Sequence, residues 1–322
     1  AFSSAFFLYG IALIYGATGS TNLADISSFL SENVLLENGL LLAGLGLLLV
    51  GFGFKVSAAP FHQWAPDVYQ GSPSPIVAFM AGGVKAAGFA GLLRVFYLGF
   101  DAYTTDWQPL VYALAVVSLL AGAVLAVVQT DVKRMMAYSS INHAGFILVG
   151  VQAATDQGVE AALFYLAAYA FLIAGTFGVI TLIGGTGDGH HDLSDYKGLG
   201  HRNPVLAAVL AVFLFAQAGV PLTSGFFAKF EVITAAVDAG SAWLAVIAMV
   251  SAVISAYLYL RIVATMYMGD DEESPVEGRE RIPVGAGIAL AISLVVTIGV
   301  GVWPGVLTEA ARDAVPVLSA LG

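Results

Sequence analysis

Apolar stretches of about twenty residues recur along the whole of this chain, and they limit its fold more than any other feature. The 322 residues are 59% hydrophobic and only 11% charged, whereas soluble domains carry about 25% charged residues. Each stretch is long enough to cross a bilayer core of about 30 Å as an α-helix, and a helix satisfies its own backbone hydrogen bonds in lipid. The sequence therefore predicts an all-α polytopic membrane protein with a single transmembrane domain over residues 1–322. We expect nine transmembrane helices, at residues 2–18, 38–59, 75–98, 109–129, 136–154, 159–184, 204–236, 242–268 and 283–303.

The composition also excludes several classes of protein. The 22 acidic residues outnumber the 12 basic ones, which argues against a nucleic-acid partner. The sequence has no cysteine, and therefore no disulfide, thiolate zinc site or ligands for an iron–sulfur cluster. No glycine-rich nucleotide-binding motif stands between a strand and a helix. We therefore expect no cofactor and no metal in this chain.

Basic residues predict the orientation of the helices in the membrane. They fall in alternate loops between the apolar stretches, whereas the intervening loops carry only acidic charges. The positive-inside rule places the basic loops in the cytoplasm. These basic residues are Lys133, Arg134, Lys197, Arg202, Arg279 and Arg281.

Two of the predicted helices contain a proline that should interrupt them. Pro60 ends the apolar part of the second helix, and Pro221 lies in GVPLTSG at the centre of the seventh. Proline removes a backbone hydrogen bond and clashes with the preceding turn. A broken backbone at membrane depth is tolerated only inside protein or along a wet cavity, and broken helices often mark a transport site. We expect interruptions near residues 56–61 and 217–225.

The two interruptions are arranged as an inverted repeat would arrange them. Lys55 precedes Pro60, whereas Lys229 follows Pro221. Because the two helices run in opposite directions through the membrane, we expect them to be related by a pseudo-two-fold axis in the membrane plane.

Three lysines in apolar segments are the strongest candidates for function: Lys55, Lys85 and Lys229. A charged side chain in the membrane costs about 2.5–3.5 kcal/mol on insertion scales. Desolvation weakens the hold of a lysine on its proton, so a buried lysine can exchange one. Any single lysine could instead snorkel to the interface or be paired structurally. Three in one chain favour a path for protons or other cations.

His143 is a further candidate for a proton relay. It lies in YSSINHAGF, with Tyr138, Ser139, Ser140 and Asn142 close by in sequence. Imidazole and hydroxyl groups can pass protons through a water-bearing bundle. The alternative is a structural histidine that is satisfied by a backbone carbonyl group.

Other polar residues have simpler interpretations. Tyr165 and Tyr169 share a helix face, and this spacing more often reflects packing. His62 follows Pro60 on an amphipathic piece, so we expect it at the interface. A loop rich in histidine and aspartate is either a metal site or, as we favour, a solvated segment; its residues are Asp188, His190, His191, Asp192 and His201.

Three segments resemble a known family. KVSAAPFHQWAPDVYQGSPSPIVAFMAGGVKAAG (55–88), TDVKRMMAYSSINHAGF (130–146) and AGVPLTSGFFAKFEV (218–232) are similar to the antiporter-like membrane subunits of respiratory complex I. That family also includes the multi-subunit sodium/proton antiporters. PFHQWAPDVYQGSPSP and PLTSGFFAKF favour its N branch over the L and M branches. The resemblance implies a fold of fourteen helices with two inverted five-helix repeats, in which helices seven and twelve are broken.

The resemblance also implies a function. Lys55, Lys85 and Lys229 would form a proton relay together with His143, driven by quinone reduction in other subunits. NADH, FMN, iron–sulfur clusters and quinone would bind to those partner subunits of the membrane and redox arms. The protein would span the bacterial plasma membrane many times, in contact with lipid. A subunit of a sodium/proton antiporter and a membrane scaffold that does not pump remain the alternatives.

The resemblance leaves one expectation about Lys55. The nine predicted helices match helices six to fourteen of the family, so we expect the chain to lack the first five. In the family a glutamate on helix five pairs with the lysine of helix seven. We therefore expect Lys55 to pair with an acid outside residues 1–322.

Overall fold

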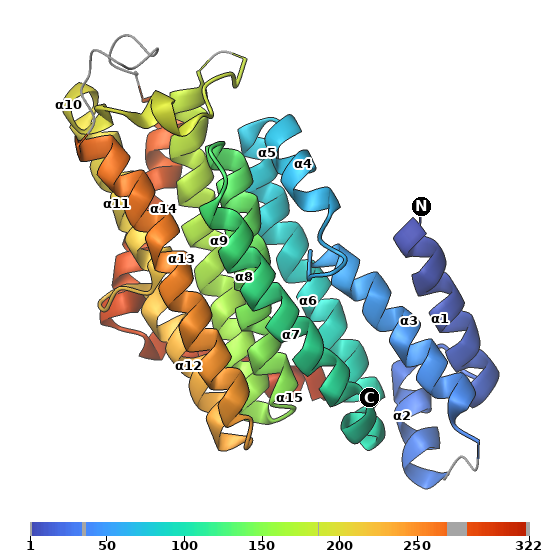
Figure 1. The fold of residues 1–322 in the computed structure, drawn as a ribbon. Coiled ribbons are helices and arrows are strands. Elements are labelled where there is room, and N and C mark those ends of the chain that lie inside the picture. Colours follow the sequence, from blue (N-terminus) through green and yellow to red (C-terminus); the bar gives the residue numbers. More distant parts are fainter. Residues whose placement is uncertain (1, 34–36, 186, 269–281, 320–322) are drawn as a thin grey trace.

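Helices make up nearly all of the described chain in the computed structural model (Figure 1). The structure describes residues 2–33, 37–185, 187–268 and 282–319. Short π-helical stretches at Met80–Val84 and Arg94–Gly99 flank α6, and 3-10 turns lie at Asp101–Tyr103 and Leu193–Tyr196. The α-helices are α1 (Phe2–Thr18), α2 (Leu23–Glu32), α3 (Gly39–Lys55), α4 (Trp64–Gly71), α5 (Ser74–Phe79), α6 (Lys85–Leu93), α7 (Thr104–Val127), α8 (Val132–Gln152), α9 (Asp156–Gly184), α10 (Leu199–Arg202), α11 (Pro204–Ala218), α12 (Ser224–Asp238), α13 (Ala242–Met268), α14 (Val284–Val302) and α15 (Gly305–Ser319).

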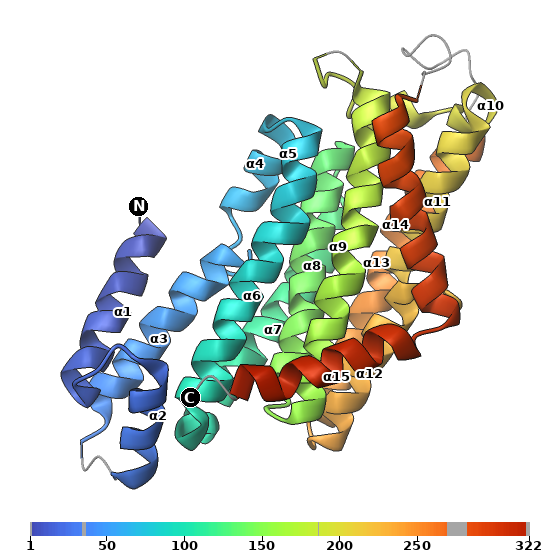
Figure 2. The ribbon, with the colours of Figure 1, turned by 180° about the vertical axis from the view of Figure 1, so that it is seen from behind.

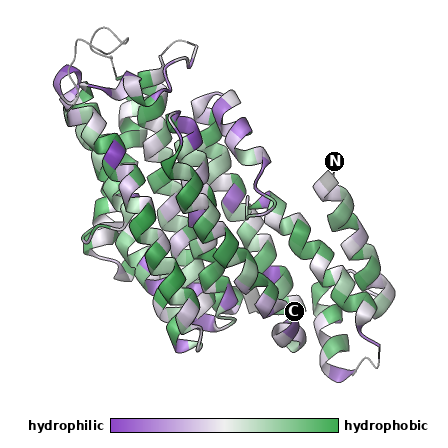
Figure 3. Cartoon of the chain, in the orientation of Figure 1, coloured by the Kyte–Doolittle hydropathy of each residue, from purple (hydrophilic) through white to green (hydrophobic). Residues whose placement is uncertain are grey.

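The apolar stretches form membrane-spanning helices, as expected. Figure 3 shows apolar residues along the helices and polar residues gathered at their ends. The expected all-α polytopic fold is therefore confirmed. Shorter apolar helices cover Ser3–Thr18, Gly39–Lys55 and Pro204–Ala218. Within the described residues, five helical stretches are long and apolar enough to cross a membrane: Ser74–Gly99, Asp101–Val127, Asp156–Gly184, Ala242–Met268 and Val284–Val302.

α8 runs through the middle of the bundle, between α7 and α9 (Figure 1). Nearly all of its residues are buried, so protein rather than lipid surrounds it and it tolerates polar side chains. α7 approaches α8 closely because glycines lie at the contact. A Cβ on Gly122 would lie 2.5 Å from the backbone nitrogen of Asn142, and one on Gly145 would lie 2.7 Å from that of Leu119.

Side-chain caps fix where the central helices begin. The Asp131 side chain accepts a hydrogen bond of 2.8 Å from the backbone N–H of Arg134 at the start of α8. Thr155 caps α9 by accepting from Gly158 at 3.1 Å. Such caps satisfy backbone N–H groups that have no partner within the helix. The caps hold the ends of α8 and α9, and thereby the register of the residues between them.

The interruptions expected near 56–61 and 217–225 are confirmed. α3 ends at Lys55, and α4 begins only at Trp64. Within this break the backbone N–H of Ala59 donates to the Ser118 hydroxyl of α7 at 2.9 Å. α11 ends at Ala218, where Gly219 takes a positive φ of 93° that suits glycine. The two-fold relation between the two breaks stays a prediction.

Two amphipathic helices do not appear among the predicted elements. They are α2, which follows α1, and α15, which crosses α9 near its start and α12 near its middle (Figure 2). α15 is tied to both helices: the Thr308 hydroxyl donates to Glu231 of α12 at 3.2 Å, and Arg312 contacts Glu160 of α9 at 3.4 Å. Both helices are too short or too polar to register as an apolar stretch, so a search for membrane spans misses them.

The basic loops that fix the predicted orientation lie at one end of the bundle where the structure describes them. Lys133 and Arg134 begin α8, and Lys197 lies beside α10, at the same end in Figure 1. α15 lies at the opposite end. Arg279 and Arg281 fall outside the described residues. The arrangement agrees with cytoplasmic basic loops and places α15 towards the outer face.

We predict that Gly225→Ala destabilises the protein. A Cβ on Gly225, in the first turn of α12, would overlap the backbone carbonyl of Ala216 in α11. Overpacking of this kind typically costs about 1–3 kcal/mol. Thermal unfolding of the purified protein should show a lower melting temperature. Gly46→Ala is the matched control, because nothing lies within 4 Å of a Cβ at Gly46 in α3. Equal melting temperatures for both variants would contradict the close approach of α11 and α12.

Candidate functional site

α8 gathers the predicted polar residues into one buried cluster. Ser140, His143 and Phe146 follow one another three residues apart along this helix. Ser140 binds Lys85, and the ring of Phe146 lies beneath the ammonium group of Lys229. The exposed fractions are 3% for Lys85, 1% for His143 and 6% for Lys229. Lys85 and Lys229 therefore lie on either side of His143, inside the protein.

Lys85 is held by neutral oxygen atoms. Its Nζ donates to the carbonyl oxygen of Ser140 at 2.6 Å and to the hydroxyl of the same residue at 2.5 Å. The Tyr69 hydroxyl of α4 lies 3.1 Å from the Ser140 hydroxyl. Lys85 also directly follows the π-helical stretch Met80–Val84, a distortion that is frequent at functional sites. Within the described residues no carboxylate forms an ion pair with Lys85.

Lys229 uses the break between α11 and α12. Its Nζ donates to the carbonyl oxygens of Gln217 at 2.8 Å and of Ala218 at 3.0 Å. These are the last carbonyl groups of α11, which have no partner within the helix and lie at its negative end. The ammonium group also lies 5.0 Å from the centre of the Phe146 ring. The broken helix thus leaves two carbonyl groups free to bind Lys229, whereas a continuous helix would use them in its own hydrogen bonds.

His143 lies in a row of hydrogen bonds that connects four helices. Its Nδ1 is 2.7 Å from the Tyr165 hydroxyl of α9, and its Nε2 is 3.2 Å from the Tyr259 hydroxyl of α13. Tyr259 is 2.6 Å from the Ser139 hydroxyl, which donates to the Gln217 side chain at 3.3 Å. Gln217 is also the residue whose backbone holds Lys229. The row therefore runs from His143 to the side chain of the residue whose backbone carbonyl group binds the second lysine.

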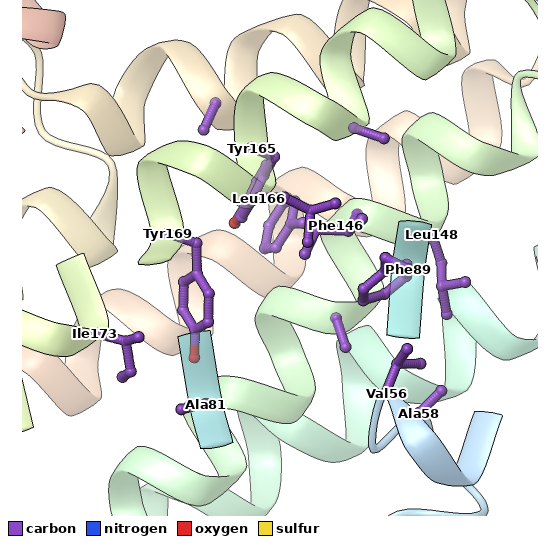
Figure 4. Packing of buried hydrophobic residues seen from close by; sticks show 14 of the residues in the cluster. Val56, Ala58, Ala81, Phe89, Phe146, Leu148, Tyr165, Leu166, Tyr169 and Ile173 are labelled. Atoms are coloured by element: carbon purple, nitrogen blue, oxygen red, sulfur yellow. The ribbon is translucent and has the colours of Figure 1, made fainter. Parts of the chain in front are cut away.

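Tyr169 separates Lys85 from His143. Its ring lies 5.6 Å from the Lys85 Nζ and 4.7 Å from the His143 ring. Its buried hydroxyl makes no hydrogen bond to any residue that the structure describes. Apolar side chains such as Leu166 and Phe146 surround this region (Figure 4).

The sequence interpretation of Tyr165 as a packing residue is incomplete, because Tyr165 is a direct partner of His143. Sequence reasoning also missed Tyr69, Tyr259 and Gln217. One signal was available for Gln217, which is the one polar side chain in the otherwise apolar helix α11. Buried polar groups of this kind need hydrogen-bond partners, so Gln217 could have been flagged without being paired.

Lys55 lies apart from this cluster. Its side chain is exposed at the end of α3 in the described chain, and the pairing with an acid outside residues 1–322 stays a prediction. It lines a cavity of about 470 Å³ between α1, α3 and α6. Within the described residues Lys55 forms no ion pair. α3 packs mainly on α1 here, and the Lys55 side chain lies beside Gly88 of α6.

At the inner end of the bundle, an ion pair joins α8 to a loop that we expected to be solvated. Lys133 is only 1% exposed, and its Nζ donates to Asp188 at 2.8 Å and to the Ser72 carbonyl at 2.7 Å. Asp188 also accepts from the backbone and hydroxyl of Ser74. Partial burial alone would raise the pKa of Asp188, but the bonds from Lys133 and Ser74 outweigh it and lower that pKa.

The histidines of this loop do not assemble a metal site. His190 lies 3.9 Å from Asp195, and His191 lies 3.7 Å from Asp188. No group of three or more metal-binding side chains occurs among the residues that the structure describes. His62 is half-buried, and its ring lies 6.4 Å from that of Tyr138.

Comparison with known proteins relates the chain to one family. The family model described as NADH:quinone oxidoreductase/Mrp antiporter, transmembrane, matches residues 1–255. NADH-quinone oxidoreductase subunit N of Trichlorobacter lovleyi is 44% identical over 318 residues, covering 99% of this chain and 65% of that protein. Subunit N of Mycobacterium tuberculosis is 45% identical over 323 residues, covering 99% and 60%. The chain thus spans about three fifths of the length of these relatives.

Solved structures show the same arrangement of helices. A chain of respiratory complex I from Thermus thermophilus is 36% identical, with a TM-score of 0.80, over 96% of this chain and 66% of that one. A chain of an archaeal membrane-bound sulfane sulfur reductase is 30% identical, with a TM-score of 0.87, over 99% and 64%. The Mrp complex from Dietzia shares the fold, at 23% identity and a TM-score of 0.87, over 99% and 66%.

We predict that Asp188→Asn lowers the free energy of unfolding by about 3 kcal/mol at neutral pH, because it leaves Lys133 buried without a counter-charge. A carboxyl group with a lowered pKa stabilises the fold above its unfolded pKa of about 3.9. That contribution is lost as the pH falls through the folded value. The difference from the wild type should therefore shrink in acid, as measured by thermal unfolding across pH. Asp313→Asn, at an exposed position of α15, is the control. A difference that grows in acid would contradict the assignment.

Proposed function

The chain belongs to the NADH:quinone oxidoreductase/Mrp antiporter transmembrane family, and on that premise we propose that it is a membrane-arm subunit of a proton-pumping NADH–quinone oxidoreductase. The chain works as part of an enzyme but carries no redox centre. NADH, FMN, iron–sulfur clusters and quinone bind to partner subunits. The protein lies in the bacterial plasma membrane beside other membrane-arm subunits and lipid. The names of the relatives and of the Thermus thermophilus complex support this assignment.

One observation carries the proposal: two buried lysines flank a histidine along α8, and hydrogen bonds extend from that histidine to the residue that holds the second lysine. Every side chain that binds His143 is a hydroxyl group that can both donate and accept. Protons can therefore pass between His143 and these hydroxyl groups without large movements of the helices. A scaffold that does not pump would have no need for this arrangement in its core.

The chemistry of the relay follows from its neutral partners. Lys229 in its charged form donates to two carbonyl groups at the end of α11. When it loses its proton, both of these bonds weaken, because a neutral amine is a poorer donor than an ammonium group. The break between α11 and α12 can then relax. Release of a proton is thus coupled to a change in the backbone, and partner subunits that move this backbone drive the release.

Lys55 serves as the end of the relay that exchanges charge with the rest of the complex. Its place at the end of the broken helix α3 supports this role. Lys85 lies between Lys55 and His143 in the sequence of transfers. α3 contacts α6, which Lys85 begins, so the two lysines occupy neighbouring helices.

We predict that Lys85→Ala and Lys229→Ala each leave the complex assembled but reduce proton translocation by about 100-fold, the size of effect expected when a proton-transfer group is lost. Quinone reduction should fall as well, because the two processes are coupled. Translocation is measured in vesicles that contain the purified complex, and assembly by native electrophoresis. Lys197→Ala, in the loop before α10, is the control.

The same assay separates the alternatives. Normal translocation by an assembled Lys85→Ala complex would overturn the relay and favour a scaffold. Translocation that follows an imposed sodium gradient, without NADH oxidation in the purified complex, would favour a subunit of a sodium/proton antiporter.

A further inference from the structure

We infer that Gln217 is a positioning residue whose side-chain amide fixes the proton of neutral His143 on Nε2. Gln217 is completely buried at the end of α11, one residue before its last helical residue, Ala218. Its side chain joins α8 to α9, while its backbone carbonyl binds Lys229. The inference stands on the directions of the hydrogen bonds, which follow from the number of hydrogens that each group carries.

The orientation of the Gln217 amide is set by Thr176 of α9. A threonine hydroxyl has a single hydrogen to donate, and Thr176 donates it to the carbonyl oxygen of Leu172 at 2.8 Å. The Thr176 oxygen can therefore only accept from Gln217, whose Nε2 lies 2.8 Å away. The opposite orientation of the amide would take the Thr176 hydrogen away from Leu172. The amide oxygen Oε1 consequently faces Ser139.

The orientation of the amide determines the direction of the hydrogen bonds that the next two hydroxyl groups, those of Ser139 and Tyr259, make. An amide oxygen only accepts, so Ser139 must donate its single hydrogen to Gln217. The Ser139 oxygen is then free to accept, and Tyr259 must be the donor of the 2.6 Å bond between them. The single hydrogen of Tyr259 is thereby used. Its oxygen can only accept a hydrogen bond from the next group in the row, which is His143.

His143 is the last group in this series of directed hydrogen bonds. Its Nε2, 3.2 Å from the Tyr259 oxygen, must carry a hydrogen. In a neutral imidazole the other nitrogen is then an acceptor. Nδ1 accordingly accepts a hydrogen bond of 2.7 Å from the Tyr165 hydroxyl. The lone pair of His143 therefore faces Tyr165, and the N–H group faces Tyr259.

The tautomer of His143 sets the direction of proton transfer in the relay. This consequence rests on the proposed function, whereas the tautomer itself does not. A proton reaches neutral His143 only at Nδ1, from the side of Tyr165. On the other side, the row ends at the amide oxygen of Gln217, which accepts hydrogen bonds but is not a titratable base. Gln217 thus keeps His143 and Lys229 apart until the amide turns or the break in the backbone moves.

The tautomer can be measured directly. The membrane complex is labelled with ¹⁵N-histidine and studied by solid-state NMR, in which a ring nitrogen with a hydrogen and one without give distinct signals. The difference from a His143→Gln complex identifies the signals of His143. We expect a protonated Nε2 and an unprotonated Nδ1 in the wild type. Thr176→Ser keeps the hydroxyl that orients the amide, so its spectrum should match the wild type.

Thr176→Val has nearly the same shape but cannot hold the amide in one orientation. It should produce a second signal set with the hydrogen on Nδ1, and Gln217→Met should do the same if Thr176→Val fails to assemble. A wild type with the hydrogen on Nδ1, or a Gln217→Met complex with an unchanged tautomer, would overturn the inference. Proton translocation measured on the same samples is a separate readout: its loss in Lys229→Ala tests the relay, whatever the tautomer of His143.

Discussion

Lys85 and Lys229 are bound by neutral oxygen atoms, and this constraint shapes the rest of the structure. Lys85 binds the backbone and hydroxyl oxygens of Ser140, and Lys229 binds two carbonyl oxygens of α11. A carboxylate partner would stay behind as a buried charge whenever the lysine lost its proton, at a cost of several kcal/mol. Carbonyl and hydroxyl dipoles leave no such charge. The ammonium groups can therefore be discharged without an ionic penalty in the core.

The fold supplies these dipoles through irregular helices. A regular helix uses every carbonyl group except the last four, so two free carbonyl groups inside the membrane require a helix that ends there. α11 ends at Ala218 for this purpose, and α12 resumes at Ser224 after Pro221. The polar side chains of α8 make a different demand on the fold, because they need a helix that is surrounded by protein rather than by lipid. The glycine contacts between α7 and α8 meet it by allowing α8 to be enclosed.

The sequence predicts the fold better than it predicts the site, and the reasons are physical. The apolar stretches and the prolines act locally, so the bundle and both breaks follow from them. Lys85 and Lys229 stand out because charge is rare in such segments. Tyr259 and Gln217 do not, because their partners lie on other helices and no spacing along the chain encodes them. Lys55 looks equally buried in the sequence, yet its exposure depends on which helices flank α3. Asp188 looks like a loop residue, and only the folded chain brings it to Lys133.

The crossing helix α15 has a mechanical consequence for the site. Its contacts with Glu231, at the middle of α12, and with Glu160, near the start of α9, hold these two helices together, in addition to the packing between them. Two helices that are held together in this way tilt as one rigid body, so α9 and α12 do not bend separately. Any movement that displaces Lys229 relative to α11 must then change the backbone conformation of residues 219–223, the short hinge between α11 and α12. This hinge directly follows the carbonyl groups of α11 that bind the ammonium group of Lys229.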